Sequence, residues 1–352
     1  MATVAGTSAR IASADALEAM ERYARNGWTD GLPIVPPTEE RVRECLEWAG
    51  LPGDHVLGIE TVRRRPLTAE KVAANAVMAG CLTPSFPVVA TALEAMCDEA
   101  FLLHGCSAST GGSAPLLVVN GPIRLELGMN ATHNALANAS RANATIGRAV
   151  WLVLINLLGC VPGELDRSTL GHPGKFTLCV AEDEEDSPWL SLAEERGLPP
   201  GSGAPRSPRS RASPRCRVMN EWTREPEEIL ETFAAAMRAN MLTYSIWSGN
   251  YAIVIAKQLR DAIVEAGWSK AGVRAYLYES ARVRRRDWES AGKAALVRDR
   301  DPEQVLTALG APDDLLVIAA GGPAGGFGAV FPPWYGDKSR AVTKGIGVYV
   351  DC

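Results

Sequence analysis

Four short apolar runs, each bounded by glycine, proline or charged residues, alternate with helix-like segments along this chain. The runs read PLLVVN (115–120), KFTLCVAE (175–182), YAIVIA (251–256) and DLLVIAAGG (314–322). Apolar residues recur at helical spacing between or after them, in 141–158, 257–266 and 267–281. Strands that alternate with helices are typical of a layered fold whose sheet is at least partly parallel. We therefore expect an α/β protein that has a mixed sheet, helices on its faces and two layered lobes.

Length and composition allow a sizeable core. The chain has 352 residues, of which 47% are hydrophobic and 22% are charged, as is ordinary for globular proteins. One stretch, GSGAPRSPRSRASPRCR (201–217), is rich in Arg, Pro and Ser and has no hydrophobic periodicity. It predicts a flexible linker between a main α/β domain (1–200), which carries the site, and a smaller C-terminal α/β lobe (218–352). No internal sequence repeat is evident.

Charge, hydropathy and cysteine usage narrow the class of protein. The net charge of −5 favours neither nucleic acid nor an anionic membrane as a partner. The longest apolar run, 149–160, is too short to span a bilayer, and the N-terminus does not resemble a signal peptide. Eight cysteines without CxxC pairs argue against a zinc ribbon and against a secreted disulfide framework. We expect a cytoplasmic homo-oligomer that acts on a small molecule.

Residues able to do chemistry concentrate between 104 and 184. There His104 is followed by a glycine-bearing loop made of Ser109, Thr110, Gly111 and Gly112. The backbone N–H groups of such a loop can cradle an anion or form an oxyanion hole, so we assign the loop to substrate binding. The spacing is neither that of a P-loop nor that of a GxSxG nucleophile elbow. A tight turn whose hydroxyls satisfy the local backbone explains the same residues equally well.

A second cluster combines amides with arginines at the start of the segment 141–158. Its members are Asn130, His133, Asn134, Asn138, Arg141, Asn143 and Arg148. Directional hydrogen bonds from such a cluster could hold a carboxylate or a planar amide of a substrate. Helix caps and surface polar contacts are the alternative interpretation.

The third and strongest candidate is the segment 166–182, a predicted loop–strand unit. It carries Asp166, His172, Lys175, Cys179 and Glu182. We predict that His172, on a constrained Gly–His–Pro turn, acts as a general acid or base, and that Lys175 binds an anion or serves as a base. Alternation along a strand would bring Lys175 and Cys179 to the same face. A purely structural turn is the alternative.

A metal site receives only weak support. His104, His133 and His172 would suffice for zinc or iron together with a carboxylate. However, no HExxH or HxH string is present, and the glycine-rich stretch 319–330 breaks the dinucleotide-binding fingerprint at Pro323. We predict no cofactor and no catalytic metal; if a metal is bound, these three histidines are the expected ligands.

Five long motifs resemble a widespread, largely uncharacterised bacterial family. They are GWTDGLPIVPPTEERV, HGCSASTGGSAPLLVVNGPI, RANATIGRA, DRSTLGHPGKFTLCVAEDEEDSPW and GWSKAGVRAYLYESA. Members of that family often occur with, or fused to, small thiol or selenol proteins that bear a UGSC or CGSC motif. The resemblance covers most of the chain and implies such a redox protein as a partner, but it implies no reaction. The stretch 201–217 departs from the family, which is apolar and strand-like there.

These observations lead to three functional hypotheses. The first is an enzyme that transforms a small polar or anionic metabolite by acid–base chemistry of the lyase or hydrolase kind, with His172, Lys175 and His104 as its main residues. The second is a thiol-dependent reductive or transfer enzyme that uses Cys179 or Cys106 with a separate redox protein. The third is a noncatalytic subunit that only binds a ligand or an assembly partner.

Overall fold

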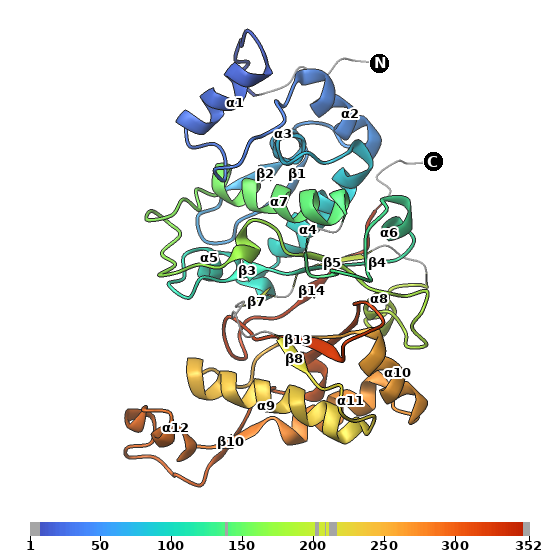
Figure 1. Ribbon diagram of the computed structural model, residues 1–352. Coiled ribbons are helices and arrows are strands. Elements are labelled where there is room, and N and C mark those ends of the chain that lie inside the picture. Colours follow the sequence, from blue (N-terminus) through green and yellow to red (C-terminus); the bar gives the residue numbers. More distant parts are fainter. Residues whose placement is uncertain (1–7, 138–139, 201–203, 208, 211–216, 348–352) are drawn as a thin grey trace.

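Two mixed β-sheets stack face to face in a computed structural model that describes residues 8–137, 140–200, 204–207, 209–210 and 217–347. Helices cover the outer face of each sheet, so the molecule has four layers (Figure 1). The α/β class and the mixed sheet expected from the sequence are confirmed. No helix in the described part of the chain has the length and apolar character needed to cross a membrane.

The first sheet has the strand order β14-β6-β4-β5. Its strands are β4 (Leu117–Asn120), β5 (Cys179–Ala181), β6 (Ala204–Ser207) and β14 (Val342–Thr343). β4 runs parallel to β5 and antiparallel to β6, and β14 is antiparallel to β6. The helices that pack on its outer face are α4 (Phe86–Met96) and α7 (Arg141–Asn156), and α3 (Ala69–Ala79) and α2 (Glu39–Ala49) pack on these helices farther from the sheet.

The second sheet has the strand order β12-β9-β13-β8. Its strands are β8 (Arg217–Met219), β9 (Tyr251–Ile255), β12 (Leu315–Ala319) and β13 (Phe327–Phe331). β9 runs parallel to β12 and antiparallel to β13, which is antiparallel to β8. Its outer face is covered by α9 (Pro226–Tyr244), α10 (Lys257–Glu265) and α11 (Lys270–Ser280).

The remaining elements are short or peripheral. The helices are α1 (Ala16–Arg25), α5 (Leu103–Ser107), α6 (Ile123–Glu126), α8 (Leu192–Glu195) and α12 (Asp287–Ser290). Three two-stranded ladders join β1 (Val56–Ile59) to β2 (Pro66–Thr68), β3 (Ala114–Pro115) to β7 (Arg209–Ser210) and β10 (Arg282–Arg284) to β11 (Val305–Thr307). The 3-10 turns are η1 (Thr83–Ser85), η2 (Glu99–Phe101), η3 (Pro173–Lys175), η4 (Ala294–Leu296) and η5 (Pro312–Asp314).

Strand alternation explains why the apolar runs are continuous. In β4, Leu117 and Val119 pack into the helix-covered core, whereas Val118 faces the second sheet. In β9, Ile253 packs against helices and Val254 faces the first sheet. Because both faces of β4 and β9 are buried, nearly all of their positions are apolar, as the sequence runs indicated, and the buried Asn120 at the end of β4 is the exception.

The two halves of the chain repeat one arrangement. In the first half, α4, β4, α6 with α7, β5 and β6 follow one another, and in the second half α9, β9, α10 with α11, β12 and β13 do so. Strand order and direction agree between the two sheets. The next strand of each half then joins the sheet of the other half. β8 follows β6 and β7 in the chain but pairs with β13 of the second sheet. β14 follows β13 in the chain but pairs with β6 of the first sheet.

Part of the stretch expected to be a flexible linker is instead paired. β6 lies between β4 and β14, and β7 pairs with β3. The ladder bonds are made by the backbone, so a segment without a strand-like side-chain pattern can still form them. Residues 201–203, 208 and 211–216 of that stretch lie outside the described residues, and Arg217 begins β8.

Candidate functional site

Asp166, Ser168 and Lys175 form a compact polar network in the loop between α7 and β5. Lys175 Nζ lies 2.5 Å from Asp166 Oδ2 and 2.7 Å from Ser168 Oγ. The Ser168 hydroxyl donates to Asp166 Oδ1 at 2.5 Å, and its backbone N–H donates to the same oxygen at 3.0 Å. The segment 166–175 therefore folds back so that a carboxylate, a hydroxyl and an ammonium group meet.

The carboxylate of this network is buried and the lysine is nearly so. Asp166 is 4% exposed, and the Lys175 side chain is 14% exposed. Burial alone would raise the pKa of Asp166, but hydrogen bonds from Lys175 and Ser168 outweigh it and hold that pKa below its ordinary value. Lys175 Nζ also lies 5.0 Å from the ring centroid of the buried Trp151 of α7, a cation–π contact. Asp166 is thus a carboxylate at neutral pH, held beside a cation.

The glycine-bearing loop 109–112 packs directly against this segment. Thr169 donates its N–H to the Thr110 carbonyl at 3.0 Å, and Ser168 Oγ lies 3.3 Å from the Ser109 carbonyl. Gly112 has a φ of +67°, and a Cβ at that position would lie only 2.9 Å from the Cα of Gly171. The two loops that the sequence proposed as separate candidates therefore pack together in one cluster.

A residue of the second half closes one side of the glycine-bearing loop. The indole N–H of Trp334 donates to Ser109 Oγ at 2.7 Å, and the same hydroxyl accepts the N–H of Gly111 at 3.0 Å. Gly105 makes room for the indole, since a Cβ there would lie 2.7 Å from the ring. The Ser109 side chain is thus held in place from both halves of the chain.

His172 lies beside the network but is committed to its own turn. Its Nδ1 accepts the N–H of Gly174 at 2.9 Å and so caps η3. In the neutral ring the proton is therefore on Nε2. The prediction that Lys175 shares a strand face with Cys179 is wrong, because Pro173 and Gly174 turn the chain and β5 begins only at Cys179.

His104 lies on α5, next to a buried carboxylate that the sequence did not indicate. Its Nδ1 is 3.6 Å from Glu60 Oε1, and Glu60 is 1% exposed. The backbone N–H groups of Val62 and Arg63 donate to the Glu60 carboxylate, and Arg63 Nε lies 3.6 Å from it. This cluster is joined to the glycine-bearing loop through α5 and places the Glu60 carboxylate beside the His104 ring.

The amide cluster is largely used for structure. Asn143, which is 2% exposed, accepts the Asn130 N–H and donates to the carbonyls of Asn130 and Cys179. The Asn130 side chain donates to the His133 carbonyl and closes a turn, and Arg141 donates to the Gly80 carbonyl. These residues brace the start of α7 against β5.

Two further members of the cluster point elsewhere, and one is not described. Arg148 makes a bidentate pair with Asp30 at 2.8 and 2.9 Å. The exposed His133 packs against the loop after β12, where a Cβ on Gly322 would lie 3.0 Å from its ring. Asn138 lies outside the described residues.

Glu182 belongs to a buried network that joins the two halves. Its carboxylate accepts hydrogen bonds from Lys270 Nζ at 2.8 Å, from Asn120 Nδ2 at 2.6 Å and from the backbone N–H of Leu192 at 2.8 Å. Burial alone would raise the pKa of Glu182, but the charge of Lys270 and these hydrogen bonds hold it below its ordinary value. With its oxygens bonded in this way and 1% exposure, Glu182 fixes one half to the other.

The histidines and cysteines do not gather into a reactive centre within the described residues. No group of three or more His, Cys, Asp or Glu side chains with metal-binding geometry occurs there. His104, His133 and His172 have separate surroundings, as described above. Cys106 and Cys179 are each 5% exposed, and burial raises the pKa of Cys179.

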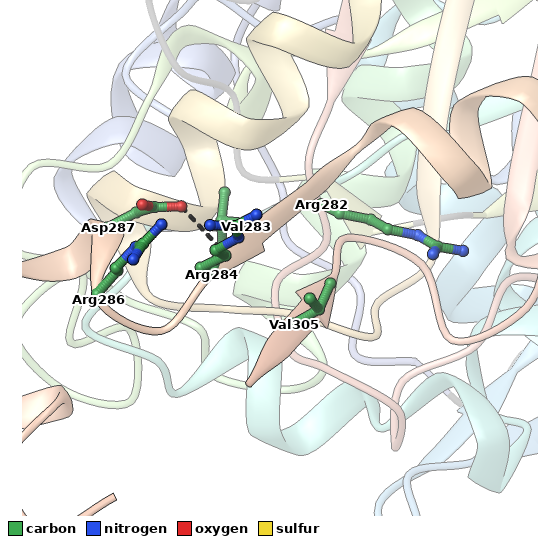
Figure 2. A pocket seen from close by; sticks show the side chains of 6 residues that line it. All are labelled: Arg282, Val283, Arg284, Arg286, Asp287 and Val305. Carbon is green, nitrogen blue, oxygen red and sulfur yellow. Dashed lines mark hydrogen bonds between the residues drawn. The ribbon is translucent and has the colours of Figure 1, made fainter. Parts of the chain in front are cut away.

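Two surface pockets in the second half lie apart from this network. One, of about 330 Å³, is lined by Arg282, Val283, Arg284, Arg286, Asp287 and Val305. In Figure 2, Arg284 and Arg286 lie beside Asp287, whereas Arg282 extends away from them. The other, of about 640 Å³, follows the 266–279 segment around Trp268 and Tyr276. Neither is lined by a residue that the sequence proposed for the site.

No protein-family model, curated protein or solved structure matches the chain. The geometry of the site therefore carries the functional argument alone.

Sequence reasoning missed Ser168, Trp151, Trp334 and Glu60, which complete the surroundings of the predicted residues. Ser168 stood two residues from Asp166 in a motif already singled out, so this spacing was an available signal. Trp334 and Glu60 reach the site from distant parts of the chain, and nothing local in the sequence indicates them.

Proposed function

We propose that this chain is an enzyme that transforms a small polar or anionic metabolite by acid–base chemistry of the hydrolase or lyase kind. The observation that carries the proposal is the contact of Lys175 Nζ with both the Asp166 carboxylate and the Ser168 hydroxyl. An ionised carboxylate and an ammonium group, held together with little exposure, supply a proton acceptor and a centre that stabilises negative charge.

Each residue then has a definite role. Asp166 is ionised at neutral pH and accepts a proton, since its Oδ1 already receives the hydrogen bond of the Ser168 hydroxyl. Lys175 binds an anionic group of the substrate or the charge that develops during reaction. His172 donates from Nε2, since its Nδ1 is engaged by Gly174. The loop 109–112 forms the second wall, and His104 supports that wall through α5.

A thiol-dependent reaction with a small thiol or selenol protein receives less support. Cys106 and Cys179 are buried, and a nucleophilic thiol must be accessible and ionised. The reaction proposed above needs no cofactor.

The proposed cellular setting is cytoplasmic and homo-oligomeric. Within the described residues, no disulfide joins Cys45, Cys81, Cys97, Cys160 or Cys179, which fits a reducing compartment. Leu17, Trp28 and Trp48, near the N-terminal end, are large apolar side chains that remain 38–63% exposed, and a subunit contact would cover them.

The test is a panel of small carboxylates, esters, amides and phosphorylated metabolites, with depletion followed by mass spectrometry. A substrate turned over by the wild-type protein should be turned over roughly 100-fold more slowly by Asp166→Asn, and a comparable loss is expected for Lys175→Met. The exposed Ser290→Ala variant in α12 serves as the control and should be unaffected. Tight binding of a panel member without turnover would instead indicate a noncatalytic binding subunit.

A further inference from the structure

We infer that Ser168 is a nucleophile that forms an acyl-enzyme, and that the substrate is therefore a small compound with an ester or amide bond. This inference rests on the proposed function and adds both a catalytic residue and a substrate class to it. The Ser168 hydroxyl lies between a proton acceptor, Asp166, and a cation, Lys175.

The hydrogen bonds of Ser168 Oγ are those that an activated hydroxyl needs. This hydroxyl donates to Asp166 Oδ1 at 2.5 Å, which is nearer than the Ser109 carbonyl at 3.3 Å, and it accepts from Lys175 Nζ at 2.7 Å. The carboxylate can take the proton as the oxygen attacks, and the ammonium group stabilises the oxygen as it loses that proton. Asp166 and Lys175 also bond each other, so both remain aimed at the hydroxyl.

Neighbouring serines in the described loops are engaged differently. Ser109 Oγ accepts from Trp334 and from the Gly111 N–H. Ser107 and Ser113 are buried and donate to the carbonyls of His104 and Cys106. Ser168, like Ser109, is half-buried. Of these four hydroxyls, Ser168 is the one bonded to both an acid and a base.

The backbone around Ser168 is fixed, as a nucleophile requires. Thr169 is tied to Thr110, and Gly171 lies against Gly112 at a distance that excludes a side chain. On the other side, the backbone N–H of Asp166 donates to the Val161 carbonyl, and the Asp166 carbonyl accepts the N–H of Gly163. The Ser168 oxygen is therefore held by contacts on both flanks of its loop.

The reaction balances as a hydrolysis in two steps. Ser168 Oγ bonds to the acyl carbon while its proton passes to Asp166, the bond to the leaving oxygen or nitrogen breaks, and the leaving group takes that proton. Water then attacks the acyl carbon and passes one proton to Asp166, the bond to Ser168 Oγ breaks, and Asp166 returns that proton to the serine oxygen. The products are a carboxylic acid and an alcohol or amine, and water is the only co-reactant.

The experiment uses the full chain and 4-nitrophenyl acetate as the acyl donor. We expect a burst of about one equivalent of nitrophenolate per chain, with the acetyl group on the peptide that contains Ser168. Ser168→Ala should abolish the burst and the adduct, whereas the control Ser290→Ala should retain both. Ser168→Cys, which keeps a nucleophilic side chain, should still form an adduct, and it replaces Ser168→Ala if that variant does not fold.

Two results separate this inference from the proposed function. If Ser168 is not acetylated in wild type, or if the burst persists in folded Ser168→Ala, then Ser168 is not the nucleophile. If in that case a metabolite is still turned over and Asp166→Asn abolishes its turnover, the acid–base function stands without the acyl-enzyme. Absence of both a burst and any turnover by wild type overturns both.

Discussion

Arg124 and Arg260 occupy corresponding positions in the two halves, and both form hydrogen bonds with the same acidic segment. Arg124 follows Val119 of β4 at the same spacing at which Arg260 follows Ile255 of β9. The carbonyl of each of these two strand residues accepts a backbone hydrogen bond from the neighbouring parallel strand. Arg124 donates to the Glu182 carbonyl and to Glu185, and Arg260 donates to Asp183 and Asp186. The segment 182–186 thus neutralises one buried cation from each half.

Loss of Arg260 should destabilise the protein strongly. Its side chain is fully buried, and Asp183 would be left as an unpaired buried charge. We expect Arg260→Met to lower the free energy of unfolding by about 3–5 kcal/mol and Arg260→Met with Asp183→Asn to recover part of it. Urea denaturation measures both. The exposed pair Arg224–Glu265 is the matched control, and Arg224→Met should cost below about 1 kcal/mol. Equal losses for the two arginine variants would contradict the argument.

Acid should weaken the junction between the halves. The pKa of Glu182 is lowered in the folded protein, so its stabilising contribution is complete above the ordinary value of 4.5 and is lost as the pH falls below it. Glu182→Gln, which cannot titrate, should reduce stability at neutral pH and flatten the decline below pH 4.5. Thermal unfolding between neutral and acidic pH follows this, and an unchanged acid slope would assign the decline to other carboxylates.

The buried thiols, together with the half-buried Cys97, should resist alkylation. Burial raises the pKa of Cys45 to about 11 and that of Cys81, Cys97 and Cys160 to about 12. Since the thiolate is the reactive form, iodoacetamide at pH 8 should modify these positions slowly in the native protein and readily in denaturant. Peptide mass spectrometry locates the adducts. Rapid native modification of Cys179 with loss of turnover would instead favour the thiol-dependent hypothesis.

The contact between the two site loops should not tolerate a side chain. Gly112→Ala combines a left-handed backbone with a Cβ placed 2.9 Å from Gly171. Gly128 has a similar φ of +60° but open space around it. Gly128→Ala should therefore cost about 1–2 kcal/mol from the backbone alone, and Gly112→Ala about 1–3 kcal/mol more. Unfolding in urea compares them, and equal costs would show that the loops can separate freely.

Local patterns of apolar residues in the sequence were sufficient to predict the α/β class of the fold. Continuous apolar runs predicted β4 and β9, and helical spacing predicted α7. The run 175–182 was read as one strand because its alternation is real, but the turn at Pro173 and Gly174 delays β5 to Cys179. Periodicity does not report where a strand begins.

The repeat and the full site depend on contacts across the sequence. Corresponding strands share direction and order without a repeat that is evident in the sequence, so only pairing shows them. The association of Asp166 with Lys175 was accessible because they lie in one loop. The contact of Trp334 with Ser109 was not, because the two residues come from different halves.

The positions of β8 and β14 make each half a complement of the other. A chain cut before β8 would give one fragment that lacks β14 and another that carries β14 but has no sheet for it to join. Bare sheet edges invite association, so such fragments should recombine with each other more readily than either folds alone. In the intact chain, each half contributes one strand to the sheet of the other half. We therefore expect a single cooperative unfolding transition, in which neither half unfolds before the other.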